Sequence, residues 1–142
     1  MSEEKLRNIP FSPPDLSSLE ENEVLEAMRS GWITTGPRTK ELERRLAEYC
    51  HTSKTVCLNS ATAAEELNFR ICGIEPGDEV IVPAYTYTAS ASAPIHCGAK
   101  VVFVDSQKDN CEMDYEKVAN AITERTKAIV AVDLGGIIAD YE

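Results

Sequence analysis

From Lys54 onward, short apolar runs alternate with longer segments of helical character, and this alternation limits the possible folds more than any other feature. The apolar runs are Thr55–Leu58, Glu79–Val82, Val101–Val104 and Ala128–Val132, and the helix-like segments lie near 62–72, 87–97 and 114–122. Nearly all-apolar strands joined by helices form parallel sheets that are covered on both faces. The pattern therefore predicts an α/β fold with a mostly parallel sheet of four strands and right-handed crossovers.

The first third of the chain has a different pattern. Residues 1–16 are polar and then rich in proline, which predicts an extended arm. A capping box at Ser18–Glu21 predicts the start of an amphipathic helix that Gly31 ends, and a second helix is expected from about Thr39. Between them, the loop Trp32–Pro37 combines an aromatic ring, two hydroxyls and a Gly-Pro turn, which suits either a binding loop or a Trp that anchors the loop to the core.

Length and charge narrow the possible functions. With 142 residues and a net charge of −10, the chain fits one domain or a piece of one, and we expect no nucleic-acid or membrane partner. The five cysteines form an odd set without a CxxC pair, which favours a reducing, cytoplasmic location. No ligand spacing typical of a metal site and no apolar run of membrane-spanning length is present.

Polar side chains follow each of the expected strands. In open α/β sheets, ligands bind at the carboxyl ends of the strands. The residues expected there are Asn59–Thr62, Pro83–Tyr87, Asp105 and Asp133–Gly136. The turn at Asn59–Thr62 leads into a helix N-terminus, which attracts phosphate, so a flat phosphorylated cofactor with its ring against Tyr85 or Tyr87 fits this edge.

Each of these residues also has an ordinary structural explanation. Ser60 or Thr62 could cap the helix alone, with Thr62–Glu65 as a capping box. A tyrosine could be buried with its hydroxyl bonded, and Asp105 could cap a turn. The sequence contains no GxGxxG motif and no P-loop, which argues against dinucleotide and nucleoside-triphosphate binding.

Five sequence blocks, in order, resemble one family. They are Gly31–Pro37, Asn59–Ala64, Pro76–Ile81, Pro83–Thr88 and Thr126–Val130. Together they resemble the DegT/DnrJ/EryC1/StrS family of sugar aminotransferases, over nearly the whole chain but only the N-terminal part of a family member. The resemblance implies the fold type I pyridoxal-phosphate architecture. It also implies transfer of an amino group from an amino acid, usually glutamate, to a nucleotide-linked keto sugar.

The resemblance also implies roles for individual residues. Ser60, Ala61 and Thr62 would hold the phosphate of pyridoxal 5'-phosphate, and Tyr87 would stack on its pyridine ring. Trp32 and Thr34 would face the sugar, in a site completed across a homodimer. Asp133 is counted among the substrate-binding residues, although the family often has His there.

The resemblance assigns the lysine of the Schiff base to a position beyond residue 142. Lys54, Lys100 and Lys127 precede or begin expected strands, roughly 15 Å from the cofactor edge, so they cannot replace it. We therefore expect residues 17–142 to be an incomplete cofactor-binding domain that is inactive and prone to aggregation by itself. A pyridoxamine-phosphate-dependent sugar dehydratase of the same family, and a non-catalytic binding or dimerising remnant, are the alternative functions.

Overall fold

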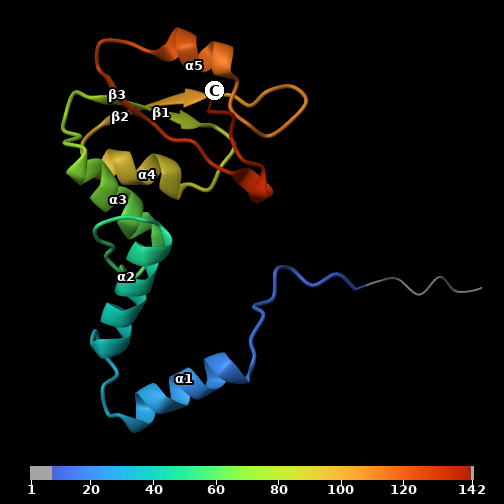
Figure 1. Cartoon of the computed structure of the whole chain (residues 1–142). Helices are drawn as coiled ribbons and strands as arrows, with labels where there is room; N and C mark the ends of the chain where they lie inside the picture. Colours follow the sequence, from blue (N-terminus) through green and yellow to red (C-terminus); the bar gives the residue numbers. More distant parts are fainter. Residues whose placement is uncertain (1–7, 142) are drawn as a thin grey trace, which may run out of the picture. The chain divides into compact units, whose positions relative to one another are not determined.

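A computed structural model describes residues 8–141, and the chain divides into two compact units, Met1–Cys57 and Leu58–Glu142. In the first unit, residues 8–17 form no helix or strand and are exposed, whereas the part of the expected arm at 1–7 lies outside the described residues. Helix α1 spans Ser18–Arg29 and helix α2 spans Pro37–Tyr49 (Figure 1).

The capping box of α1 lies one residue earlier than the sequence predicted. Ser17 is the N-cap, and its hydroxyl accepts a hydrogen bond from the backbone N–H of Leu19 at 3.2 Å. The Glu20 carboxylate accepts from the Ser17 backbone N–H at 2.6 Å. Gly31 follows the helix with a φ of +71°, and its N–H donates to the Met28 carbonyl, so the predicted helix end is confirmed.

The expected strand at Thr55–Leu58 does not form, so the prediction of a four-stranded sheet was wrong. The segment finds its hydrogen-bond partner on α2 instead. The Thr55 hydroxyl donates to the Glu43 carbonyl at 2.5 Å, and the Cys57 N–H donates to the Glu43 carboxylate at 2.9 Å. An apolar run shows that the side chains of a segment suit a sheet. It does not show that a neighbouring strand is available to pair with that segment.

The second unit contains a parallel sheet of three strands in the order β2-β1-β3. The strands are β1 (Glu79–Pro83), β2 (Lys100–Val104) and β3 (Thr126–Ile129), all close to their predicted positions. In the register of the central pair, Glu79 lies opposite Lys100 and Pro83 lies opposite Val104. The three strands therefore end at one common edge, as the fold-class prediction requires.

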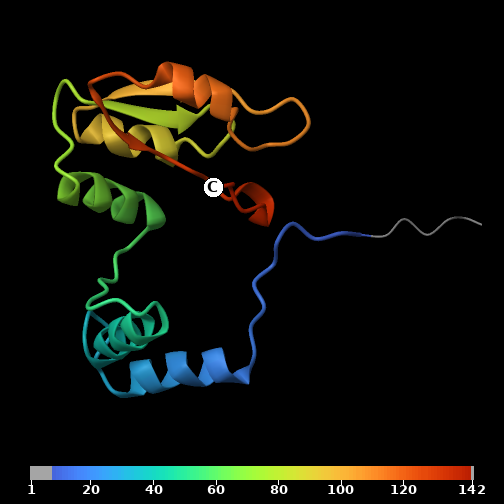
Figure 2. The ribbon, with the colours of Figure 1, turned by 45° about the horizontal axis from the view of Figure 1, so that its top comes forward.

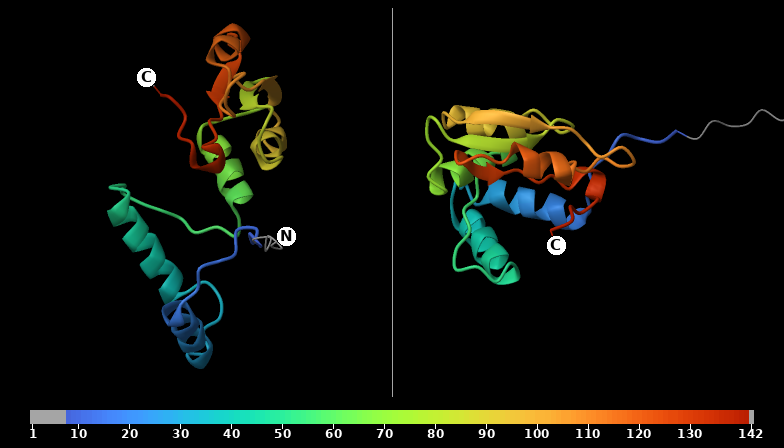
Figure 3. Two further views of the ribbon diagram at one scale, coloured as in Figure 1. Left: turned by 90° about the vertical axis from the view of Figure 1, so that its right-hand side faces the viewer. Right: turned by 90° about the horizontal axis from the view of Figure 1, so that it is seen from above.

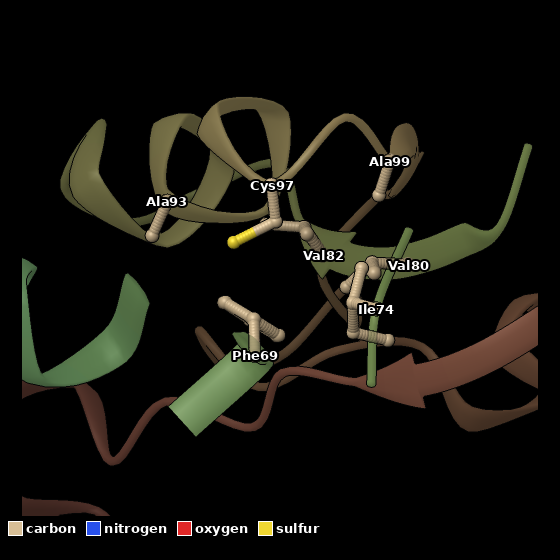
Figure 4. Close-up of a cluster of buried hydrophobic side chains, with 7 residues drawn as sticks. All are labelled: Phe69, Ile74, Val80, Val82, Ala93, Cys97 and Ala99. Carbon is tan, nitrogen blue, oxygen red and sulfur yellow. The ribbon is translucent and has the colours of Figure 1, made fainter. Parts of the chain in front are cut away.

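Helices cover both faces of this sheet (Figures 1 and 2). They are α3 (Ala61–Ile71), α4 (Ala89–His96) and α5 (Tyr115–Ala121). Val80 and Val82 of β1 pack with side chains from the α3 and α4 region, and Figure 4 shows Phe69 of α3 beneath Cys97. Ile81 points to the opposite face, where it clusters with Val104, Met113 and Val118 of α5. This alternation is the period-two pattern of a strand that is buried on both sides.

Helix α4 forms although Pro94 lies inside it. The proline is almost fully buried and stands in the last turn, where only one helical hydrogen bond is lost. Beyond β3, the chain makes a short 3-10 turn, η1 (Leu134–Gly136), and then runs on as an irregular segment (red in Figure 3).

A buried carboxylate joins the beginnings of the three strands. Glu79, the first residue of β1, is only 2% exposed. It accepts hydrogen bonds from Thr123 at 2.7 Å, from Lys100 at 3.0 Å and from Arg125 at 2.8 Å. Lys100 begins β2 and Arg125 directly precedes β3, so one side chain holds together the sheet edge opposite the strand ends.

Candidate cofactor site

The N-terminus of α3 presents free backbone N–H groups. Ser60 is the N-cap, and its hydroxyl accepts from the Ala63 N–H at 3.1 Å. Ala64 donates to the Ser60 carbonyl, whereas no acceptor within residues 8–141 is found for the N–H groups of Ala61 and Thr62. Two free donors at the positive end of a helix fit a phosphate group. In Figures 1 and 2 this end of α3 lies on the side of the sheet to which the β1 arrowhead points.

The predicted capping box at Thr62–Glu65 was wrong, because Ser60 occupies the cap position and Thr62 lies within the first turn. The Thr62 hydroxyl is therefore not used as the helix cap. One carboxylate oxygen of Glu65, Oε2, is buried and lacks a hydrogen-bond partner within the described part of the chain. Ser60 thus has the structural role of a helix cap. The backbone N–H groups of Ala61 and Thr62 remain available for a ligand.

Tyr87 lies in the segment between β1 and α4, beyond the carboxyl end of β1. Its side chain is 79% exposed, so its ring is accessible rather than buried. The segment itself is held in place, because the Ser90 N–H donates to the Tyr87 carbonyl at 3.2 Å and the Thr86 and Ser90 hydroxyls lie 3.3 Å apart. Ser90 is buried in the first turn of α4. A fixed backbone with an accessible ring fits stacking on a flat cofactor.

Asp133 follows β3 and takes part in local structure. One of its carboxylate oxygens accepts from the Ala139 N–H at 3.1 Å, which folds the segment after η1 back on itself. The Tyr115 hydroxyl accepts from the Asp140 N–H at 2.9 Å and donates to Glu112 at 2.8 Å. The Glu112 carboxylate raises the pKa of this hydroxyl. Asp133 therefore helps to fix the conformation of the segment that follows β3.

Lys100, Lys117 and Asp105 have local polar partners in the second unit. Lys100 and Lys127 lie at the strand beginnings, as predicted, but Lys54 precedes no strand. Asp105, after β2, accepts from the N–H of Ser106 at 2.9 Å, which is the turn-capping role. Sequence reasoning missed Lys117 on α5, whose ammonium lies 3.2 Å from Asp114 and 3.9 Å from Asp105. Its three-residue spacing from Asp114 was the available signal.

The Trp32–Pro37 loop joins α1 to α2 within the first unit. The Trp32 indole N–H donates to the Thr35 carbonyl at 3.0 Å, while 56% of the side chain remains exposed. Thr34 is exposed as well. A cavity of about 140 Å³ is lined by Ser30, Trp32, Thr34, Gly36, Pro37 and Arg38. The two predicted substrate residues of this loop therefore border one concave surface.

Metal-binding clusters and membrane-spanning helices are both absent from the described residues. No group of three or more His, Cys, Asp or Glu side chains there could hold a metal ion. None of the helices described is long and apolar enough to cross a membrane.

Comparison with known proteins gives consistent matches. The model of the DegT/DnrJ/EryC1/StrS aminotransferase family matches residues 14–142. Spr1654 of Streptococcus pneumoniae, a protein assigned as a sugar aminotransferase and solved in its pyridoxal-phosphate form, is 62% identical with a TM-score of 0.88. That match covers 95% of this chain and 34% of the other.

Two further matches differ in chemistry. The UDP-4-amino-4-deoxy-L-arabinose–oxoglutarate aminotransferase of Shewanella sediminis is 39% identical over 94% of this chain and 34% of its own length. A solved GDP-4-keto-6-deoxymannose-3-dehydratase is 27% identical with a TM-score of 0.81, over 89% of this chain and 34% of the other. The chain thus spans about a third of the length of the relatives that it matches.

Proposed function

Because the chain belongs to the DegT/DnrJ/EryC1/StrS aminotransferase family, we propose that it forms the phosphate-binding and ring-binding part of a pyridoxal-phosphate-dependent sugar aminotransferase. The amino donor is an amino acid, with glutamate as the leading candidate, and the acceptor is a keto sugar carried on a nucleotide. The name of the Shewanella relative, which specifies a UDP-linked sugar and oxoglutarate, supports both assignments.

The free N-terminus of α3 is the observation that carries this proposal. The N–H groups of Ala61 and Thr62, with the Thr62 hydroxyl, bind the cofactor phosphate, and Ser60 keeps this turn in shape by capping the helix. The exposed Tyr87 ring would stack on the pyridine ring of the cofactor. When bound, the cofactor would carry the amino group from the donor to the acceptor.

The other predicted site residues, Trp32, Thr34 and Asp133, are proposed to bind the sugar substrate. Trp32 and Thr34 border the concave surface between α1 and α2, which we assign to the sugar. One oxygen of Asp133 holds the Ala139 N–H, and we propose that its carboxylate also faces the substrate. Lys100 and Lys127 lie at the opposite edge of the sheet, where Lys100 is engaged with Glu79, and we assign neither of them to the covalent link with the cofactor.

We also propose a cytoplasmic enzyme that works as a homodimer, with residues 17–142 as part of its cofactor-binding domain. The absence of a membrane-spanning helix within residues 8–141 is consistent with this location. Free cysteines suit a reducing compartment, and Cys50, Cys72 and Cys111 are free and exposed.

Binding of pyridoxamine 5'-phosphate to the purified chain tests the proposal. This probe lacks the aldehyde, so it forms no adducts with surface lysines. We expect Thr62→Val to weaken binding about tenfold or more, because a hydrogen bond to a charged phosphate is lost. Tyr87→Ala should weaken it about two- to tenfold through lost stacking. Isothermal titration calorimetry measures both effects.

Two controls sharpen this experiment. Tyr85→Ala removes a neighbouring tyrosine that is 61% exposed and should leave the affinity unchanged. Pyridoxamine without the phosphate should bind much more weakly than the phosphorylated probe. Equal binding of the two probes, or equal effects of the Tyr85 and Tyr87 changes, would contradict the proposed site.

A sugar dehydratase is the second candidate function, and the match to the GDP-4-keto-6-deoxymannose-3-dehydratase supports it. The two functions differ in their product. In the complete enzyme, an aminotransferase converts the keto sugar nucleotide into an amino sugar nucleotide, whereas a dehydratase removes water and leaves no nitrogen on the sugar. Mass spectrometry of the nucleotide sugar after incubation with glutamate distinguishes the two.

A further inference from the structure

Gly36 is the one buried residue among residues 8–57, and it lies directly against the Trp32 indole. A Cβ atom built on Gly36 would lie 2.0 Å from Nε1 and 2.4 Å from Cδ1 of that ring. The backbone of Gly36 has a φ of −167°, which any residue adopts. The need for glycine is therefore steric, and it comes from the tryptophan ring rather than from the backbone conformation.

Hydrogen bonds fix the ring and both ends of the loop. The Trp32 indole N–H donates to the Thr35 carbonyl at 3.0 Å, one residue before Gly36. At the start of the loop, the Ser30 hydroxyl donates to the Ala27 carbonyl at 2.7 Å and accepts from the Trp32 backbone N–H at 3.2 Å. Gly36 itself is the N-cap of α2, and its carbonyl accepts from the Lys40 N–H at 3.1 Å. The loop is thus tied to the last turn of α1, to the first turn of α2 and to its own indole.

We propose that Gly36 and Ser30 are positioning residues that lock the Trp32 ring and so hold the loop that carries Thr34. Because the indole N–H is used within the loop, the loop offers an incoming sugar the exposed indole face and the Thr34 hydroxyl, and no indole donor. Assignment of the loop to the sugar rests on the function proposed above, whereas the lock stands on the contacts of the free chain.

Trp32 is the single tryptophan of the chain, so its fluorescence reports on this lock alone. In Gly36→Ala the added methyl displaces the ring and breaks its bond to Thr35. We expect the emission maximum to move toward its value in denaturant and acrylamide quenching to increase. Ser30→Ala should change both quantities in the same direction. Ile33→Ala removes a side chain of the same loop that is 82% exposed and should change neither.

A double-mutant cycle keeps the inference testable if Gly36→Ala unfolds the first unit. In Trp32→Ala the space beside Gly36 is empty, so the added methyl meets no ring. Gly36→Ala should then destabilise the chain less in the Trp32→Ala background than in the wild type, as measured by urea unfolding with circular dichroism. Equal destabilisation in both backgrounds, or unchanged fluorescence of a folded Gly36→Ala variant, would overturn the lock.

Neither measurement requires a ligand. If pyridoxamine 5'-phosphate binds as expected but the cycle shows no coupling, the lock fails and the proposed function stands. If coupling is present but Thr62→Val leaves cofactor binding unchanged, the lock stands and the proposed cofactor site fails.

Discussion

The carboxylate of Glu79 is only 2% exposed, yet it accepts three hydrogen bonds from side-chain donors. Hydrogen bonds from Thr123, then Lys100 and Arg125, lower the pKa of this carboxyl from about 4.5 to about 2. A carboxyl group whose pKa is lower in the folded state stabilises the fold above its unfolded pKa. This stabilisation is lost as the pH falls through the folded value. The window for Glu79 therefore runs from about pH 4.5 down to about pH 2.

Glu79→Gln is expected to lower stability at neutral pH, because Lys100 and Arg125 lose their shared anion. It should also flatten the decline in the free energy of unfolding between about pH 4.5 and pH 2. Urea unfolding followed by far-ultraviolet circular dichroism at a series of pH values measures both effects. Glu124→Gln is the matched control, because it removes an exposed carboxylate that lies between Thr123 and Arg125, two of the residues that donate to Glu79. An acid profile of Glu79→Gln identical to that of the wild type would refute the role of Glu79.

At the scale of the element, Phe69 attaches α3 to the core of the second unit. Its ring is 8% exposed and clusters with Val80, Val82, Ala93 and Cys97 (Figure 4). The same helix carries the free N–H groups that we assign to the phosphate. The orientation of the candidate site therefore depends on hydrophobic contacts made two turns further along the helix.

Phe69→Ala should destabilise the second unit by about 3–5 kcal/mol, through lost burial and a residual cavity. Ile71→Ala changes a residue on the same helix that is 72% exposed, and it should cost no more than about 0.5 kcal/mol. Chemical denaturation monitored by circular dichroism compares the two variants. Similar costs for both would show that α3 is not held by Phe69.

The sequence predicted the elements well where apolar periodicity coincided with burial. The strands at 79, 100 and 126 and the helices between them are apolar on the faces that pack, and all of them form. The segment at 55–58 is a similar apolar run, but its Thr55 hydroxyl and its Cys57 backbone N–H both donate to Glu43, and no local pattern reveals these bonds. The α1 cap was shifted because Ser17–Glu20 and Ser18–Glu21 both satisfy the capping-box spacing, and only the backbone decides between them.

The candidate site was predictable only in outline. The position of Tyr87 beyond the carboxyl end of β1 followed from the order of the elements, whereas the strand that was expected to lead into Thr62 does not form. The return of the Ala139 N–H to Asp133, six residues earlier, depends on the path of an irregular segment, which propensity does not describe. The contact between Gly36 and Trp32 likewise required three-dimensional packing, because a glycine before a proline looks like an ordinary turn.

At the scale of the whole molecule, the two units differ in burial. Neither α1 nor α2 has a buried residue, and their large apolar side chains are at least 40% exposed. In the second unit, all five residues of β1 are buried. Local opening costs little free energy where few apolar contacts are broken, and it approaches the global value within a core strand.

Hydrogen exchange should reflect this difference in one sample of the intact chain. We expect amides in β1 to exchange at least about tenfold more slowly than amides in α1 and α2. Mass spectrometry of peptides covering residues 18–29, 37–49 and 79–83 measures the rates. Equal protection of α1 and β1 would show that α1 is covered in solution by contacts beyond those described.

The hydrogen bonds from Thr123, Lys100 and Arg125 to Glu79 lie at the edge of the sheet where the strands begin. The candidate site lies at the opposite edge, roughly one strand length of 15 Å away. Side chains that secure the frame are therefore separate from those that meet a ligand. If these segments bind the ligand as proposed, insertions or replacements at 84–88 and 134–138 would alter ligand binding without loosening the beginnings of the strands. Such a division lets substrate preference drift through evolution, or be exchanged by loop grafting, while the scaffold is inherited unchanged.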